Sequence, residues 1–158
     1  MSKVHADVKI RGLKVEDLDE VVRIDRLHTG IPKPDYWPRV FRDYLGRGGR
    51  DRTFGIGVDG EGGLAAYLFG EVRAAEFGSE PCGWIFAVGV DPQHLRDGVG
   101  SALLAEARSR FERLGVSTVR TRVQRSEIPV LSFFRSNGFV GGPYVQLEMP
   151  VADPEVME

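Results

Sequence analysis

Six segments of the chain have the pattern of apolar and polar residues that is typical of β-strands. In some, apolar residues alternate with charged ones, and in others an apolar run lies between glycines. These segments are residues 7–12, 52–58, 64–74, 82–90, 117–123 and 144–149. The glycine-rich turn at 59–63 joins the second and third segments, so we expect these strands to pair as an antiparallel hairpin.

Four further segments repeat apolar residues at the spacing of amphipathic helices. They cover residues 13–28, 35–45, 98–115 and 128–138. The third has the clearest pattern, because its apolar residues fall on one helical face: Val99, Leu103, Ala107, Phe111 and Leu114. Gly115 follows where a C-terminal cap is expected, and the glycine-rich stretch after residue 45 predicts the end of the second helix.

Strands and helices are interspersed along the whole chain, which predicts a mixed α/β fold around one sheet. The 158 residues are 42% hydrophobic and 28% charged, as in ordinary soluble globular proteins. This length suits one domain, and no repeat or long linker divides it. We expect a single domain over 1–158, with the acidic residues 153–158 as a frayed tail.

Charge and composition narrow the choice of partners and compartment. The 21 basic and 23 acidic residues nearly cancel, which argues against binding of nucleic acid or an anionic membrane and favours a small-molecule partner. Cys82 is the only cysteine, so no internal disulfide forms, as in cytoplasmic proteins. No segment has the length of a membrane span or the apolar core of a signal peptide, and no metal site is predicted.

The connection between the strand at 82–90 and the helix at 98–115 has the composition of an anion site. Glycines at 98 and 100 allow a ligand to approach the backbone, and the first turn of a helix offers unpaired N–H groups to a phosphate. Leu103 stands where a Rossmann fingerprint needs a third glycine, and no P-loop lysine is present. A different class of phosphate-binding turn is therefore expected.

This stretch resembles the signature of the GCN5-related N-acetyltransferases (GNAT family). Three groups of residues carry the resemblance: the strand end at Val88, Val90 and Pro92, the turn at Gly98, Val99 and Gly100, and the helix start at Ser101, Leu103 and Leu104. One departure is Leu95, which stands where the family has Gln or Arg, while Arg96 lies one place later. The resemblance implies a central, mostly antiparallel mixed sheet of about six or seven strands flanked by about four helices.

A second family motif, which ends in Gly-Phe, matches Gly138 and Phe139. Counting back along it puts Glu127 at the family's Asn and Phe134 at the Tyr that is proposed to protonate the leaving thiolate. A phenylalanine has no proton to give. The resemblance implies acetyl-CoA as cofactor, held by the following residues: Val88, Gly89, Val90, Leu95, Arg96, Asp97, Gly98, Val99, Gly100, Ser101, Glu127, Phe133 and Phe134.

Two residues are candidates for moving protons during acyl transfer. Glu71, on the strand beside 82–90, is the candidate general base, acting directly or through water. Alternatively, Glu71 is a strand carboxylate paired with Arg73. Tyr144 is the candidate general acid, with Ser132 or a bound water as substitutes; Tyr144 can equally be a strand aromatic at the surface. His94 either touches phosphate or faces solvent.

The acceptor site is expected, by resemblance, between the first two helices and the last strands. Candidates for recognising an amine there are Asp25, His28, Thr29, Tyr36 and Trp37. The two aromatic residues could equally fasten their helix to the core, and Trp84 is expected in the core.

These observations predict an N-acetyltransferase that acts on an amine of a small molecule or of a protein or peptide. One rival is an acyl-CoA sensor of the same fold with little catalysis, which the phenylalanine at 134 suggests. A more distant rival is an unrelated phosphate-binding protein. Many relatives are dimers, so a homodimer is a further expectation by resemblance.

Overall fold

The structure, a computed structural model, describes residues 8–45, 52–74 and 78–152. The chain divides into two compact units, Met1–Gln124 and Arg125–Glu158. The predicted frayed tail at 153–158 and the glycine-rich stretch after residue 45 lie outside the described residues. Among the described residues, no helix is both long and apolar enough to pass through a bilayer.

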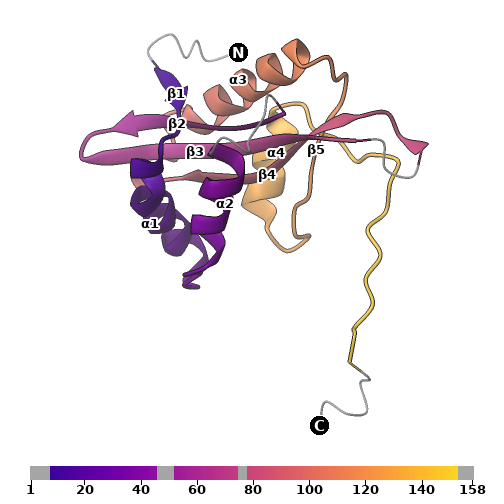
Figure 1. Cartoon of the computed structure of the whole chain (residues 1–158), viewed down its shortest axis with the longest axis horizontal. Helices are drawn as coiled ribbons and strands as arrows, with labels where there is room; N and C mark the ends of the chain where they lie inside the picture. The colour runs from indigo at the N-terminus through magenta and orange to yellow at the C-terminus, as the bar shows by residue number, and fades with distance from the viewer. Residues whose placement is uncertain (1–7, 46–51, 75–77, 153–158) are drawn as a thin grey trace. The chain divides into compact units, whose positions relative to one another are not determined.

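The first unit is built on a five-stranded sheet, whose strands follow one another in chain order (Figure 1). The strands are β1 (Ile10–Gly12), β2 (Thr53–Gly60), β3 (Gly63–Arg73), β4 (Cys82–Val90) and β5 (Val119–Thr121). The first four pair antiparallel, and β5 joins β4 in parallel. The mixed, mostly antiparallel sheet is confirmed, although it has fewer strands than the six or seven expected.

The hairpin between β2 and β3 forms where the glycines predicted it. Gly60 pairs with Gly63, which leaves a two-residue turn of Glu61 and Gly62. Gly62 has a φ of 82°, a left-handed conformation that glycine adopts without steric cost.

The described residues form four α-helices, as predicted. They are α1 (Leu18–Thr29), α2 (Tyr36–Leu45), α3 (Val99–Arg113) and α4 (Ile128–Ser136). Two single turns of 3-10 helix precede longer elements: η1 (Val15–Asp17) ahead of α1, and η3 (Pro92–His94) after β4. Four residues of the predicted apolar stripe, Val99, Leu103, Ala107 and Phe111, are buried because α3 packs on the sheet. The fifth, Leu114, follows the last residue of α3 and is 36% exposed.

Helices α1 and α2 cover one face of the sheet, and α3 covers the other (Figure 1). On the α1–α2 face, Trp37 and Phe41 pack with Tyr67 and Phe69 of β3 in one buried cluster. On the other face, Phe111 of α3 meets Phe54 of β2, with ring centroids 5.1 Å apart. Both faces are apolar, so the sheet is fixed from two sides.

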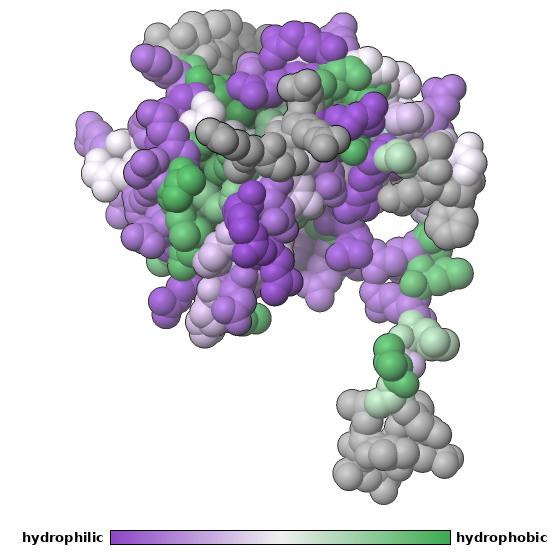
Figure 2. Space-filling model, viewed as in Figure 1, coloured by the Kyte–Doolittle hydropathy of each residue, from purple (hydrophilic) through white to green (hydrophobic). Residues whose placement is uncertain are grey.

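The predicted strand at 144–149 is wrong. These residues are extended but form no strand, and Val145, Leu147 and Met149 are 79%, 88% and 81% exposed. Figure 2 shows apolar side chains along this stretch, just ahead of the grey C-terminal residues. Alternating apolar and polar residues determine which side chains lie on each face of a strand. They do not provide the neighbouring strand with which its backbone must pair, and a β-strand forms only where such pairing occurs. For the same reason the strand predicted at 117–123 forms only over Val119–Thr121.

Candidate functional site

Strands β4 and β5 part after a short parallel contact. Their pairing runs from Gly83 with Val119 to Ile85 with Thr121 and ends there. β4 continues to Val90, still paired with β3 on its other side. Residues 86–90 therefore have one backbone edge that β5 does not satisfy. Apart from the Val90 carbonyl, which is hydrogen-bonded to His28, such groups can bind an extended ligand.

A β-bulge marks the point where the two strands separate. Phe69 pairs with Ala87 and Gly70 pairs with Ile85, so Phe86 has no opposite residue on β3. A bulge places two successive side chains on one face of a sheet. Phe86 and Ala87 accordingly both pack against the cluster under α1 and α2. The bulge thus adjusts β4 at the start of its free edge.

The turn between β4 and α3 has backbone features that favour an anion. Gly98 is the N-cap of α3 with a φ of 74°, which favours glycine. No side chain caps this end, and the first turn of α3 contains no acidic residue. The first backbone N–H groups of α3 are therefore without helical partners at the positive end of the helix dipole. Leu95, Arg96 and Asp97 expose their side chains beside it.

An ion-pair network fixes the start of this turn to α1. Asp91, the last residue before η3, is 8% exposed and accepts hydrogen bonds from Gln93 N and Arg23 Nη1 at 2.9 and 2.7 Å. Arg23 also reaches Glu20 at 2.7 Å and donates to the Leu64 carbonyl at 3.1 Å. The backbone N–H of Gln93, and then Arg23, hold the pKa of Asp91 below its usual value.

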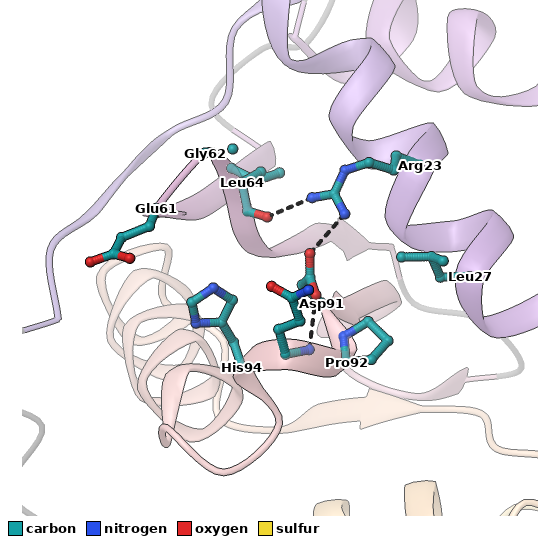
Figure 3. A pocket seen from close by; sticks show the side chains of 10 residues that line it. Arg23, Leu27, Glu61, Gly62, Leu64, Asp91, Pro92 and His94 are labelled. Carbon is teal, nitrogen blue, oxygen red and sulfur yellow. Dashed lines mark hydrogen bonds and ion pairs between the residues drawn. The ribbon is translucent and has the colours of Figure 1, made fainter.

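A cavity of about 380 Å³ lies beside this network, between α1, the β2–β3 turn and residues 91–94 (Figure 3). His94 lines it and is half-buried, with Nδ1 2.9 Å from the Asp97 carboxylate. Neither β5 nor α3 contributes a described residue to its lining. The cavity is therefore distinct from the free edge of β4.

The residues predicted to recognise an acceptor amine are mostly engaged within the protein. Asp25 is buried; it accepts a hydrogen bond from Trp37 Nε1 at 3.0 Å and forms an ion pair with Lys33 at 3.0 Å. Thr29 donates to the Asp25 carbonyl. These contacts fasten the connection between α1 and α2, which is a structural role for Asp25.

The other two acceptor candidates lie at the surface. His28 hydrogen-bonds through Nε2 to the carbonyl of Val90, the last residue of β4. The imidazole thereby joins the end of α1 to the free edge. Tyr36 is 41% exposed, and its ring meets Trp37 edge-on with centroids 5.0 Å apart. Among the acceptor candidates, His28 therefore has a hydrogen bond to β4.

Glu71, the candidate base, lies on the α2 side of β3 and has two hydrogen-bond donors. Arg73 Nε reaches Oε1 at 3.1 Å, and the Tyr44 hydroxyl donates to Oε2 at 3.0 Å. Burial, and next the charge of Glu71, raise the pKa of Tyr44 to about 12, so the phenol stays protonated at neutral pH. Tyr44 escaped sequence analysis because it continues the apolar spacing of α2, which indicates a core residue.

Trp84 is not the core residue that its apolar strand predicted. It pairs with Glu71 across β3 and β4 and is only half-buried. The guanidinium carbon of Arg73 lies 4.2 Å from the centroid of its ring system. Phe86, on the same face, packs on the Tyr44 ring with centroids 4.7 Å apart. A carboxylate and three aromatic rings therefore gather where β4 approaches its bulge.

The remaining candidates belong to the second unit. Glu127 is the N-cap of α4, where its backbone carbonyl accepts from Leu131 N at 3.0 Å. Phe134 is 4% exposed and contacts the rings of Phe133 and Phe139. Tyr144 is 55% exposed in the extended stretch that follows. Within this unit, the aromatic residues of α4 thus form a small cluster and Tyr144 is at the surface.

Comparison with known proteins identifies the family. The sequence model described as "Acetyltransferase (GNAT) family" matches residues 18–139. The chain belongs to the GNAT acetyltransferase family. The match runs from the first residue of α1 to three residues past the end of α4, and so includes the opening between β4 and β5 and the turn before α3. The resemblance stated from the β4–α3 turn is confirmed.

Two curated relatives are 28% identical to the chain. The [ribosomal protein bS18]-alanine N-acetyltransferase of Escherichia coli K12 aligns over 130 residues, 82% of this chain and 79% of that enzyme. The mycothiol acetyltransferase of Saccharomonospora viridis aligns over 89 residues, 54% of this chain but only 29% of that protein. Both relatives are named as acetyltransferases, and this GNAT protein is likewise an N-acetyltransferase.

Solved structures share the fold at low identity. The aminoglycoside 6'-N-acetyltransferase AAC(6')-IG of Acinetobacter haemolyticus superposes with a TM-score of 0.75 at 16% identity, covering 92% of this chain and 99% of that one. AAC(6')-Iy, solved with a bisubstrate analogue of CoA and an acetylneamine, gives a TM-score of 0.77 at 14% identity, with the same coverage. These likenesses extend the GNAT architecture to nearly the whole chain.

Proposed function

We propose that this GNAT protein transfers an acetyl group from acetyl-CoA to a primary amine of a small molecule or of a protein or peptide. The observation that carries the proposal is the free edge of β4 at 86–90, which leads directly into the uncapped N-terminus of α3. An extended chain that ends in a diphosphate matches both features.

The residues present fit CoA on two grounds of this structure. The left-handed Gly98 delivers the N–H groups of α3 without a capping carboxylate, so a diphosphate meets no negative side chain in that first turn. The opening between β4 and β5 leaves main-chain groups of 86–90 for the amide-containing pantetheine arm. Arg96 adds a positive charge beside the turn, partly offset by Asp97.

Acetyl-CoA supplies an activated acyl carbon, whose bond to sulfur breaks as the amine nitrogen bonds to it. The chain's own residues must then remove a proton from the amine and provide one to the thiolate. We assign the first task to Glu71, through a water, since both carboxylate oxygens already accept hydrogen bonds from Tyr44 and Arg73. We assign the second to Tyr144 or to water, because Phe134 has no proton.

We propose that the acceptor is a primary amine of one of the two kinds named for similar proteins, a protein N-terminus or an amino sugar. One relative is named for a ribosomal protein alanine and others for aminoglycosides. A screen should therefore include alanine-terminated peptides and aminoglycosides.

Phe134, which has no proton to donate to the thiolate, supports a second candidate function, an acyl-CoA sensor with slow turnover. The location is a separate point: the single, buried Cys82 supports a cytoplasmic location, where thiols stay reduced.

Thermal unfolding with and without acetyl-CoA tests the cofactor site. A ligand at one hundred times its Kd stabilises the folded state by about 2.7 kcal/mol. We compare wild type with Gly98→Asn and Gly98→Asp, two side chains of equal size that both tolerate the left-handed conformation better than most. The Asn variant should keep most of the shift and the Asp variant should lose it, because only Asp places a negative charge at the phosphate position.

Thiol release across the amine screen then separates the two functions. Stabilisation by acetyl-CoA with amine-dependent thiol release establishes the acetyltransferase. Stabilisation without release over the whole screen favours the sensor. No shift with saturating acetyl-CoA in the wild type would refute both functions.

A further inference from the structure

The partly exposed cluster around Glu71 contains a carboxylate and aromatic rings, which are the groups that bind cations in proteins. We infer that Glu71, Trp84 and Tyr44 form a subsite for a positively charged group of the acceptor, a guanidinium or an ammonium, and that Arg73 fills it in this structure. The inference rests on the proposed function, because it names the class of amine used: one that carries a second positive charge.

The carboxylate of Glu71 is held ready for a cation. Its side chain is 19% exposed, and the Tyr44 hydroxyl fixes one oxygen by a 3.0 Å hydrogen bond. Tyr44 is in turn fixed by packing on Phe86. The second oxygen points to Arg73, whose Nε lies 3.1 Å away. A carboxylate that one neutral donor orients still has its second oxygen for a cationic partner.

Trp84 supplies the aromatic wall of the subsite. Its indole is covered by the guanidinium of Arg73 at 4.2 Å. The negative face of an indole attracts cations more strongly than that of other aromatic side chains. Because Trp84 stands opposite Glu71 on the neighbouring strand, the same cation touches both groups.

Arg73 has the features of an exchangeable occupant. It is the last residue of β3, and its side chain is 35% exposed. A cationic ligand that replaced it would preserve the charge balance at Glu71. The tether makes Arg73 a strong competitor, since an attached group acts at an effective concentration in the millimolar range or above. The wild type should therefore bind free cations weakly and variants without this charge more tightly.

The position of the subsite defines the spacing of the ligand. Trp84 precedes the bulged Phe86 by two residues, or about 7 Å along a strand. The opening between β4 and β5 begins at the bulge, and we place the reacting amine there. An acceptor that matches both places has its reactive amine and its second cation separated by a short chain of about this length.

The test measures binding of N-ethylguanidinium by titration calorimetry, with N-ethylurea as the uncharged probe of the same shape. The proteins are wild type, Arg73→Met, which keeps an apolar stem over Trp84, and Arg73→Met combined with Glu71→Gln. The single variant should bind N-ethylguanidinium about tenfold more tightly than wild type and should not bind N-ethylurea; the double variant should lose that gain. Arg73→Gln serves as the second single variant if Arg73→Met is poorly folded.

Equal affinities in all proteins, or equal binding of the urea, would overturn the subsite. Stabilisation by acetyl-CoA, measured on the same samples, keeps the two proposals apart. If acetyl-CoA stabilises the variants and the guanidinium does not bind, the subsite is wrong and the acetyltransferase stands. If the guanidinium binds but acetyl-CoA does not, the cation site stands and its role in acceptor recognition is wrong.

Discussion

Arg23 Nη1 lies 2.7 Å from Asp91 Oδ2, and this ion pair joins the middle of α1 to the residue that caps η3. The same guanidinium also reaches Glu20 and the start of β3. Three elements distant in sequence thereby meet at one side chain, just ahead of the turn proposed to hold diphosphate. The position of that turn consequently depends on α1.

Replacing Arg23 with Gln should lower the free energy of unfolding by about 1–2 kcal/mol. Hydrogen bonds to charged groups contribute about this much, and the partial exposure of Arg23 reduces the upper limit. Urea unfolding measures the change. Arg26→Gln, on the exposed side of the same helix, is the matched control and should change stability by less than about 0.5 kcal/mol. Equal effects of the two substitutions would contradict a special role for Arg23.

The stabilisation from this network should disappear in acid. The Arg23 guanidinium and the backbone N–H of Leu64 lower the pKa of Glu20, and Gln93 N–H and Arg23 lower that of Asp91. A carboxyl group whose pKa is lower in the folded state stabilises the fold above its unfolded value, here 4.5 and 3.8. This contribution is lost as pH falls through the folded values. The difference between wild type and Arg23→Gln should be constant at neutral pH and shrink below about pH 4.

Tyr44 should make the fold sensitive to alkali. Its pKa is raised from 10.0 to about 12, first by burial and then by Glu71. A phenol with a raised folded pKa contributes stability that is complete below pH 10 and is lost as pH rises toward 12. Wild type should therefore lose stability over this interval, and Tyr44→Phe should lose less. Difference absorbance of the phenolate between the two proteins gives the pKa directly, and a value near 10 would show that the hydroxyl is not buried against Glu71.

Substitutions of Asp25 distinguish a structural carboxylate from one that binds the acceptor. Asp25→Ala leaves the buried indole N–H of Trp37 without its acceptor, which should cost about 2–3 kcal/mol. Asp25→Asn keeps an oxygen for Trp37 and loses only the charge toward Lys33, so about 1 kcal/mol is expected. If Asp25 instead recognises the amine, Asp25→Asn will raise KM strongly while stability hardly changes.

Phe134→Tyr should raise the rate of thiol release and lower stability. The family resemblance puts a tyrosine hydroxyl here, and a positioned acid contributes about a hundredfold or more to such reactions. Phe134 is 4% exposed between Phe133 and Phe139, so an added hydroxyl without a partner costs about 1–3 kcal/mol. Steady-state kinetics with the best amine of the screen, beside thermal unfolding, measures both effects. Phe134→Leu is the control, because it changes packing without adding a proton donor; a rise in both variants would exclude the acid role.

The sequence predicted the elements whose evidence is local. The spacing of the apolar residues in α3 predicts both that the segment is helical and which of its faces is buried. The hairpin between β2 and β3 is predicted by the glycines of its turn. Pairing between distant segments could not be predicted in this way. The alternation at 144–149 is as regular as that of real strands, yet no strand forms there, because backbone pairing depends on a partner elsewhere in the structure.

The same limit applies to the candidate site. The glycine turn leads into α3 at the residues that predicted it, because that pattern lies within one continuous stretch; its binding of a phosphate stays a prediction. The contact of Tyr44 with Glu71 joins residues 27 positions apart, and Arg73 covers Trp84 through side-chain geometry alone. A tryptophan in an apolar strand is most simply interpreted as core. That Trp84 is half-exposed and lies opposite Glu71 depends on the pairing register of β3 and β4, which the sequence does not specify.

The extended stretch after α4 also affects how the protein must be handled. Val145, Leu147, Met149 and Val151 lie on the same side of the alternation, and each is at least 79% exposed. An exposed apolar stretch with this alternation can add to the edge of a sheet in another molecule. Light scattering should therefore rise steeply with concentration, and Leu147→Lys should suppress that rise. The concentration at which the protein can be stored and crystallised should therefore depend on this short segment.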